Sequence, residues 1–328
     1  MNIKNKKNDL TTEVKKEVLE AEARIREFII ETRLEPSPFL SDMADANVYL
    51  KCDNQQITNS FKLRGAMNKI LSLSGEERER GVTTASTGNH GSAVAYVLDK
   101  FGINGSIYLP ENAAKPKVDL IRSYGADLKF HGEDCLRAEL KAKETAEQND
   151  MVYVSPYNDM KIVGGQGTLA VELTRQIDHI DTVICPVGGG GLIGGIAGYL
   201  KALNENIQII GAFPENCTHM AESCKAGRMV EMDAKPTIAD GVEGALEPGA
   251  VTLDICMQCV DDFIFVSEEE IEEALKSVMA RHFMLLEGAG ALSTAAFIKE
   301  KERFKNKNVV LIISGGKIGL EKLKTIIC

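Results

Sequence analysis

Two periods of hydrophobicity alternate along the chain, one typical of buried strands and the other of amphipathic helices. Short runs rich in valine and isoleucine end in glycine or polar turns, and most are followed by stretches in which apolar residues recur three or four positions apart. Such strand–helix repeats favour parallel sheets with helices on both faces. Strands are predicted at residues 47–53, 81–86, 105–110, 126–132, 151–156, 181–187, 207–213 and 308–314. Helices are predicted at residues 60–73, 92–102, 115–125, 134–148, 188–203 and 267–283.

The order of these elements predicts an α/β protein of two lobes, with parallel-rich sheets flanked by helices. A chain of 328 residues is long for one domain and sufficient for two. We expect a large domain from residues 1–74 and 158–328 and a small domain from residues 75–157. Ligands of such folds bind at the carboxyl ends of the strands, so a site is expected in the crevice between the lobes.

Single residues mark three of the predicted helix starts. Ser267 precedes three glutamates and an apolar stripe, the pattern of an N-cap followed by acids in the first turn. Glu287 precedes another glycine-opened helix, either as a capping acid or as a carboxylate that faces the crevice. Within residues 163–177, the helical spacing is expected to begin after Gly167.

Charge and composition exclude several classes of function. The formal net charge is −10 and no segment concentrates lysine and arginine, whereas nucleic-acid binding needs a concentrated cationic surface. No run of about 18 apolar residues is present, so no helix that spans a bilayer is predicted. The basic residues near the amino terminus have no apolar run behind them, and no signal peptide is predicted. We therefore expect neither nucleic acid nor membrane as a partner.

The eight cysteines are scattered, which predicts a reducing, cytoplasmic location rather than a disulfide-bonded scaffold. Cys256 and Cys259 form a single CxxC, and Cys217, His219 and Cys224 are near one another in sequence. A structural zinc site needs four ligands, which this pattern supplies only through a long-range pairing. The helical spacing of Cys256 and Cys259 is typical of two buried thiols that pack as small hydrophobes. No metal site is expected.

Lys62 lies just inside a predicted helix start, in the sequence SFKLRGA. In isolation, a lysine here is typical of a helix surface, with its ammonium group in water. Near the positive end of the helix dipole, however, protonation of its amine is disfavoured. A neutral amine is what Schiff-base chemistry requires, so Lys62 is also a candidate nucleophile.

Two turns that follow predicted strands are candidate anion sites. In STGNHG, residues 86–91, backbone N–H groups, hydroxyls and the Asn89 amide can bind a carboxylate or simply cap the next helix. The four glycines 188–191 follow the strand DTVICPV and allow a phosphate to approach several N–H groups closely. The same segment matches GxGxxG, with Glu215 near the place of a ribose-binding acid, so a dinucleotide site is an alternative.

A third turn, ISGGK at residues 313–317, ends the last predicted strand. Because it lies at a strand's carboxyl end, Ser314 is expected to point its hydroxyl into the crevice between the lobes. The alternative is a plain strand-to-helix turn that binds no ligand.

Taken together and in this order, these segments resemble the fold type II pyridoxal-phosphate enzymes, specifically the serine/threonine dehydratase family. The resemblance covers about residues 35–325 and rests on SFKLRGA, STGNHG, the glycine loop with Leu192, and SGG. The set is specific, since a dinucleotide enzyme has no reason to carry the other three. It implies a two-lobed fold similar to the tryptophan synthase beta subunit. Residues 240–256 also resemble the hydroxyectoine-utilisation branch of the family.

The resemblance implies a pyridoxal 5′-phosphate cofactor bound covalently by Lys62, which is also the catalytic residue. Phe61 would pack beside the cofactor ring, Asn89 would hydrogen-bond its 3′-oxygen, and Ser314 would face its pyridine nitrogen. Gly241 matches a position near the cofactor's edge. The cofactor's phosphate would be held by Gly188, Gly189, Gly190, Gly191 and Leu192. The substrate carboxylate would be bound by Ser86, Thr87, Asn89 and His90.

The implied reaction eliminates the β-hydroxyl of L-threonine, L-serine or a related β-hydroxy amino acid, giving a 2-oxo acid and ammonia. Lys62 would remove the Cα proton as general base, and the cofactor ring would take up the electrons. Because Ser314 is a neutral partner, the pyridine nitrogen need not be protonated, which favours loss of the hydroxyl over transamination. The family also implies a homodimer, or a homotetramer built from dimers.

Four positions depart from the family pattern. Asn59 replaces a usual glycine, although asparagine tolerates positive φ better than most residues. Lys317 replaces a common asparagine after SGG, which is expected to alter the region beyond the ring. Phe213 stands where many relatives have a cation-binding acid, and His219 stands near a second expected acid, although Glu215 is placed to compensate.

Three other functions remain open from the sequence, one of which is that of a catalytically silent binding or regulatory homologue. A serine or amino-acid racemase needs a second acid or base on the opposite face of the substrate, and Thr87 stands where serine racemases of this family place a serine. A nicotinamide-dependent oxidoreductase built on the GxGxxG is a more remote alternative.

Overall fold

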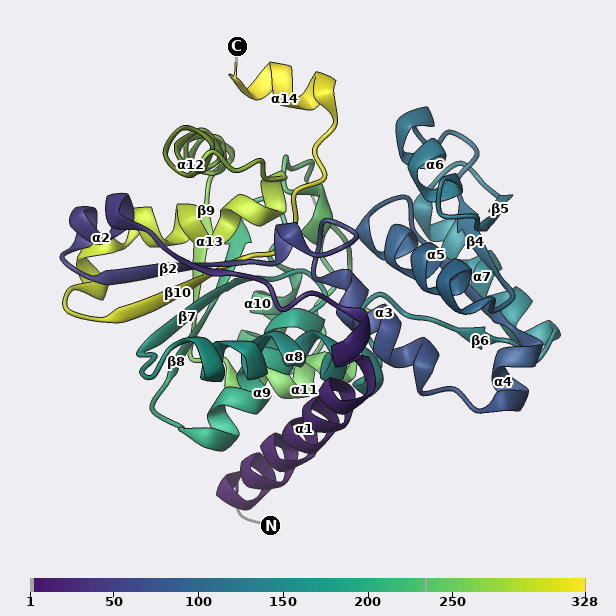
Figure 1. Ribbon diagram of the computed structural model, residues 1–328, viewed down its shortest axis with the longest axis horizontal. Helices are drawn as coiled ribbons and strands as arrows, with labels where there is room; N and C mark the ends of the chain where they lie inside the picture. Colours follow the sequence, from purple (N-terminus) through teal and green to yellow (C-terminus); the bar gives the residue numbers. More distant parts are fainter. Residues whose placement is uncertain (1–2, 234, 328) are drawn as a thin grey trace.

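The protein consists of two α/β lobes, each built around its own sheet (Figure 1). The computed structural model describes residues 3–233 and 235–327. The larger sheet has the strand order β1-β2-β10-β7-β8-β9, in which only β1 and β2 pair in antiparallel fashion. Its strands are β1 (Leu34–Pro36), β2 (Asn47–Cys52), β7 (Thr182–Pro186), β8 (Gln208–Pro214), β9 (Asp262–Val266) and β10 (Asn308–Ile313).

The smaller sheet is fully parallel, with the strand order β5-β4-β3-β6. Its strands are β3 (Val82–Ala85), β4 (Gly105–Leu109), β5 (Asp127–Phe130) and β6 (Val152–Tyr153). The helices of this lobe are α4 (Gly75–Arg80), α5 (Asn89–Phe101), α6 (Lys115–Arg122) and α7 (Cys135–Gln148). These consecutive β–α units confirm the predicted class of parallel sheets flanked by helices.

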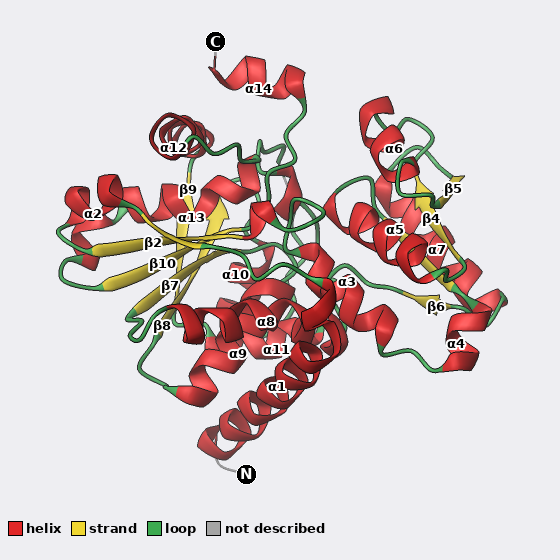
Figure 2. Cartoon of the chain, viewed as in Figure 1, coloured by secondary structure: helices red, strands yellow, loops and turns green. Residues whose placement is uncertain are grey.

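Helices cover both faces of the larger sheet (Figure 2). On one face lie α2 (Pro38–Ala44), α12 (Glu268–His282) and α13 (Gly288–Lys299). On the other lie α1 (Ile3–Ile25), α8 (Met160–Gln176), α9 (Gly191–Leu203), α10 (His219–Ala226) and α11 (Val251–Cys259). The remaining elements are α3 (Lys62–Leu71), α14 (Leu320–Ile327) and the short helices η1 (Arg26–Phe28), η2 (Asp53–Gln55), η3 (Asp240–Val242) and η4 (Lys301–Phe304).

Strand β10 shows why this sheet is buried on both sides. Val309 and Leu311 contribute to the core beneath α12 and α13, whereas Val310 and Ile312 contribute to the core beneath α8 and α9. Successive side chains of a strand point to opposite faces, so a continuous apolar run fits a strand covered on both. This confirms the prediction for the last strand.

Two of the three predicted helix starts are confirmed and one is wrong. Ser267 caps α12 with a reciprocal capping box to Glu270. Glu287 stands at the N-cap position of α13, but its carboxyl makes no capping bond and accepts from Asn89 and Lys317 instead. Helix α8, in contrast, begins at Met160 and contains Gly167 in its middle. Gly167 is required there by packing, since a Cβ would lie 2.3 Å from Val18 of α1.

Candidate active site

The segment before α3 is paired with the loop after β10, which brings two of the predicted motifs together. Ser60 and Gly315 form an isolated β-bridge, Phe61 N–H donates to Ser314 O at 3.0 Å, and Gly316 N–H donates to Asn59 O at 3.0 Å. Asn59 has φ of 55°, so the departure from glycine is accommodated by a residue that tolerates this region. Lys62 and Ser314 are therefore held at the same edge of the larger sheet.

Lys62 is the first residue of α3, and its amine lies in a confined environment. Nζ donates a 2.8 Å hydrogen bond to Pro156 O and lies 5.2 Å from the centre of the Phe61 ring. Burial lowers the pKa of Lys62 to about 8, and the nearby Glu287 carboxyl only partly opposes this effect. A substantial fraction of the amine is therefore neutral near pH 8, as a nucleophile or general base requires.

The glycine loop, residues 188–191, joins β7 to α9 and is tightly enclosed by neighbouring residues. A Cβ on Gly188 would lie 3.0 Å from Val242, and one on Gly189 would lie 2.4 Å from the Tyr157 ring. Gly190 has φ of +83°, a conformation that favours glycine. The first N–H groups of α9, including that of the buried Leu192, have no acceptor within the helix and can bind an anion.

The turn between β3 and α5 carries the predicted carboxylate site. Ser86 Oγ accepts a 3.1 Å hydrogen bond from Gly88 N–H, and Thr87 lies beside it, partly exposed. The His90 ring is buried, with Nε2–H donating to Val154 O at 3.0 Å. Burial and the positive charge of Lys62 lower the pKa of His90 to about 3, so the ring is neutral. Its ring is thus engaged within the small lobe, which leaves backbone N–H groups and hydroxyls to face a ligand.

Asn89 connects the two lobes. From α5 of the small sheet's lobe, its Nδ2 donates a 2.7 Å hydrogen bond to Glu287 Oε1, at the start of α13 in the other lobe. Burial, together with Asp240, raises the pKa of Glu287 to about 7, although the Asn89 bond and the Lys317 N–H oppose this. A Cβ added to Gly241 would lie 3.5 Å from Glu287 Oε1, so the predicted edge residue also borders this site.

Lys317 is the departure from the family with the clearest structural effect. Its Nζ is buried without a hydrogen-bond partner among the described residues, and burial lowers its pKa to about 8. The Glu287 carboxyl partly opposes that shift. The site therefore contains two lysines of lowered pKa around one carboxyl group.

Pyridoxal phosphate fits these residues. The glycine loop offers bare backbone to a phosphate, and Lys62 offers a lysine amine of lowered pKa. Beside Gly315, in the turn after β10, Asn89 Oδ1 and Ser60 Oγ are buried polar atoms without a partner among the described residues. Such atoms are rare in folded proteins and indicate the place of a ligand or water. Bound there, the cofactor supplies an electron-accepting ring.

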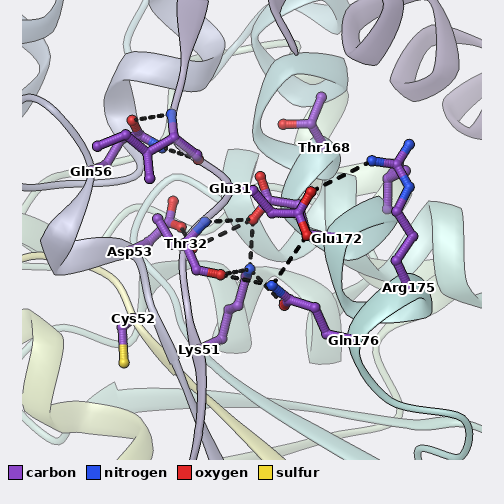
Figure 3. A network of polar contacts seen from close by, with 12 residues as sticks. Glu31, Thr32, Lys51, Cys52, Asp53, Gln56, Thr168, Glu172, Arg175 and Gln176 are labelled. Carbon is purple, nitrogen blue, oxygen red and sulfur yellow. Dashed lines mark hydrogen bonds and ion pairs between the residues drawn. The ribbon is translucent and has the colours of Figure 1, made fainter. Parts of the chain in front are cut away.

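A buried ion cluster that the sequence did not reveal holds the first turn of α3. The Arg64 guanidinium, two residues after Lys62, bonds Asp53 at 2.7 and 2.8 Å and Glu172 at 2.7 and 3.0 Å. Lys51 donates to Glu172, Gln176 and the Thr32 carbonyl (Figure 3). All four charged side chains, those of Lys51, Asp53, Arg64 and Glu172, are fully buried. The cluster ties the Lys62 helix to β2 and α8.

The positions considered for metals have other partners. Phe213 is buried in the core, His219 Nε2 bonds Met232 O at 2.8 Å, and Glu215 pairs with Lys299. Cys256 and Cys259 are both buried in α11. Among the described residues, no group of three or more His, Cys, Asp or Glu side chains is arranged to hold a metal ion.

Comparison with known proteins assigns the family. Residues 25–315 match the family described as pyridoxal-phosphate dependent enzyme. The catabolic L-threonine dehydratase TdcB of Staphylococcus aureus is 42% identical over 315 residues, which cover 95% of this chain and 91% of that protein. The chain belongs to the pyridoxal-phosphate dependent enzymes. Pyridoxal phosphate is its cofactor, and the predicted dinucleotide alternative, which rested on the GxGxxG pattern and Glu215, gives way to this family.

Solved structures of this pyridoxal-phosphate family have the same fold. The processed form of threonine deaminase isoform 2 from Solanum lycopersicum has a TM-score of 0.92 at 34% identity, covering 96% of this chain and 93% of that one. Maize serine racemase has a TM-score of 0.89 at 33% identity, covering 95% of both chains. Together with the dehydratase relative, these matches confirm the prediction of a pyridoxal-phosphate enzyme of the carbon–nitrogen lyase type. Because one of the similar structures is a serine racemase, the racemase alternative also stays open.

Proposed function

We propose that this enzyme eliminates the β-hydroxyl of L-threonine, L-serine or a related β-hydroxy amino acid, releasing a 2-oxo acid and ammonia. The observation that carries the proposal is the position of Lys62, a lysine of lowered pKa. Its amine bonds the Pro156 carbonyl, one residue before the Tyr157 ring that packs on Gly189, and its charge acts on His90 of the Ser86–Gly91 turn. The 42% identity to a threonine dehydratase over 95% of the chain supports the same reaction.

In this proposal, each residue acts on a stated group. Lys62 Nζ removes the Cα proton as general base, and the Pro156 carbonyl orients the amine while it is free. The proposed phosphate ligands are Gly188, Gly189, Gly190, Gly191 and Leu192, with Phe61, Asn89, Gly241 and Ser314 around the cofactor ring. The proposed ligands of the substrate carboxylate are Ser86, Thr87, Asn89 and His90.

The test is release of 2-oxo acid from a panel of L- and D-amino acids by the enzyme loaded with pyridoxal phosphate. We expect product from L-threonine or L-serine, and none from Lys62→Ala. Lys69→Ala is the matched control, since Lys69 lies on the same helix but pairs with Asp159. Absence of product from every substrate, with the cofactor bound, would refute the elimination.

The second candidate is a racemase, favoured by the likeness to maize serine racemase. A racemase requires a second acid or base on the opposite face of the substrate. The candidate for this group is the Thr87 hydroxyl, in the Ser86–Gly91 turn, where serine racemases of the family have a serine. Chiral analysis of the recovered amino acid separates the two activities: inversion that is lost in Thr87→Val while elimination persists would assign racemisation to this residue.

Three further features belong to the proposal. We assign residues 1–74 and 158–328 to a large cofactor-binding domain and residues 75–157 to a small domain, which is supported by the separate sheets. A homodimer or homotetramer is proposed from the family. A cytoplasmic location is supported by the seven free thiols in the described part of the chain, where no helix has the length and hydrophobicity of a membrane crossing.

A further inference from the structure

Tyr157 lies between the glycine loop and the segment of residues 243–250. A Cβ added to Gly189 would lie 2.4 to 2.6 Å from three atoms of the Tyr157 ring, so the ring packs directly on that glycine. The Tyr157 hydroxyl accepts a 2.7 Å hydrogen bond from the backbone N–H of Glu247. One side chain therefore contacts two loops that come from different parts of the chain.

Neighbouring contacts extend this connection in both directions. Pro156 O accepts the hydrogen bond from Lys62 Nζ, and Asn158 Oδ1 accepts one of 3.0 Å from Val251 N–H at the start of α11. From α11, Thr252 Oγ1 donates a 2.7 Å bond back to Gly189 O. The segment 155–158 thus lies between the catalytic amine, the glycine loop and the beginning of α11.

The glycine loop needs such support from outside. Four consecutive glycines lose more conformational entropy on ordering than other residues do, and they have no side chains with which to hold one conformation. The Tyr157 ring provides an apolar wall on one side of the loop. Burial raises the pKa of Tyr157, so its hydroxyl stays protonated and its oxygen remains a neutral acceptor for Glu247 N–H.

We propose that Tyr157 is a positioning residue with two separable parts: its ring fixes the glycine loop for the cofactor's phosphate, and its hydroxyl fixes residues 243–250 at the crevice. The inference rests on the proposed role of the glycine loop and is independent of which amino acid is the substrate. Loss of the ring should weaken cofactor binding, whereas loss of the hydroxyl alone should leave cofactor binding intact and loosen the 243–250 segment.

The experiment compares Tyr157→Phe, which keeps the ring, with Tyr157→Leu, which removes it. Tyr108→Phe is the matched control, because its hydroxyl forms a 2.9 Å bond to Thr145 Oγ1 in the small lobe. Hydrogen exchange of the Glu247 and Val251 amides is measured in the cofactor-free protein, and pyridoxal phosphate is titrated by absorbance. KM and kcat are then measured with L-threonine or L-serine.

For Tyr157→Phe, we expect exchange of the Glu247 amide to be faster by about 2- to 10-fold, the range of one hydrogen bond, with Val251 unchanged. Its cofactor Kd should stay within about twofold, with KM raised and kcat little changed. For Tyr157→Leu, cofactor Kd should rise by about tenfold or more, since the loop loses its apolar wall. Unchanged Glu247 exchange in Tyr157→Phe, or equal cofactor affinity in the two variants, would overturn the proposal. The exchange and titration readouts hold even if no amino acid is consumed.

Discussion

Replacement of Glu172 by glutamine would remove one negative charge from a cluster in which four charged side chains are fully buried. The Glu172 side chain is fully buried and accepts hydrogen bonds from Arg64 at 2.7 and 3.0 Å and from Arg26 at 2.8 Å, besides its ion pair with Lys51. Burial alone would raise the pKa of Glu172, but Arg64 and Lys51 outweigh it and hold that pKa well below its usual range. The carboxylate is therefore ionised throughout the stable pH range.

The magnitude follows from the charge balance. The four fully buried side chains are two basic groups, Lys51 and Arg64, and two carboxyl groups, and Glu172→Gln leaves the two basic groups facing a single carboxyl. Removing one partner of a buried ion pair costs about 3–5 kcal/mol. Since a domain is stable by only about 5–15 kcal/mol in total, this single substitution should remove a large part of the free energy of unfolding.

Urea unfolding of the cofactor-free protein, followed by circular dichroism, measures this loss. Glu321→Gln is the matched control, since Glu321 pairs with Lys324 at 2.8 Å but is 85% exposed. The control should lose less than about 1 kcal/mol. If Glu172→Gln also loses less than about 1 kcal/mol, the ion cluster does not stabilise α3.

Three further predictions concern single residues of the site. Asn59→Gly should preserve stability within about 0.5 kcal/mol, whereas Asn59→Val should lose about 1–2 kcal/mol at φ of 55°, as thermal unfolding would show. Gly190→Ala should weaken pyridoxal-phosphate binding about tenfold in an absorbance titration, because Gly190 has φ of +83°, where an alanine costs about 1–2 kcal/mol; unchanged affinity would contradict the role of the loop. The pKa of His90 is lowered from 6.5 to about 3, so the unfolded chain binds the proton first and stability falls as pH drops below 6.5. By pH 5 the loss from His90 should reach about 2 kcal/mol, and His90→Asn should flatten this slope in urea unfolding at pH 5 to 7.

Local patterns in the sequence predicted most elements because they depend on near neighbours. The apolar run of β10 indicated a strand covered on both faces, and Ser267 with the following glutamates indicated a capped helix. Gly167 was misread as a helix boundary. A glycine is needed at position 167 because α1 approaches α8 closely there. This tertiary contact joins residues about 150 positions apart, and no local hydrophobic period indicates it.

Within the site, the residues that the sequence did not reveal, Arg64 and Tyr157, also owe their roles to contacts that are distant along the chain. An arginine in an amphipathic helix is usually exposed, so nothing in the sequence indicates that Arg64 is buried. Its partners Asp53 and Glu172 lie 11 and 108 residues away along the chain. Tyr157 belongs to no recognised motif. It follows β6 and Gly189 follows β7, so the two residues meet only when the two sheets have come together. A hydrophobic period shows which face of an element is buried, but it does not identify the element that covers it.

The position of β10 also bears on how the chain is made. During synthesis, the strands of the small sheet are complete once residue 153 has left the ribosome, and each can pair with neighbours already present. In the larger sheet, β2 and β7 are both joined to β10, whose residues 308–313 emerge last among the strands. Until then, the nascent chain carries two unpaired parallel edges, which are the surfaces most prone to join other chains. A chain stopped before residue 308 is therefore left with two separate half-sheets rather than with one slightly shortened sheet.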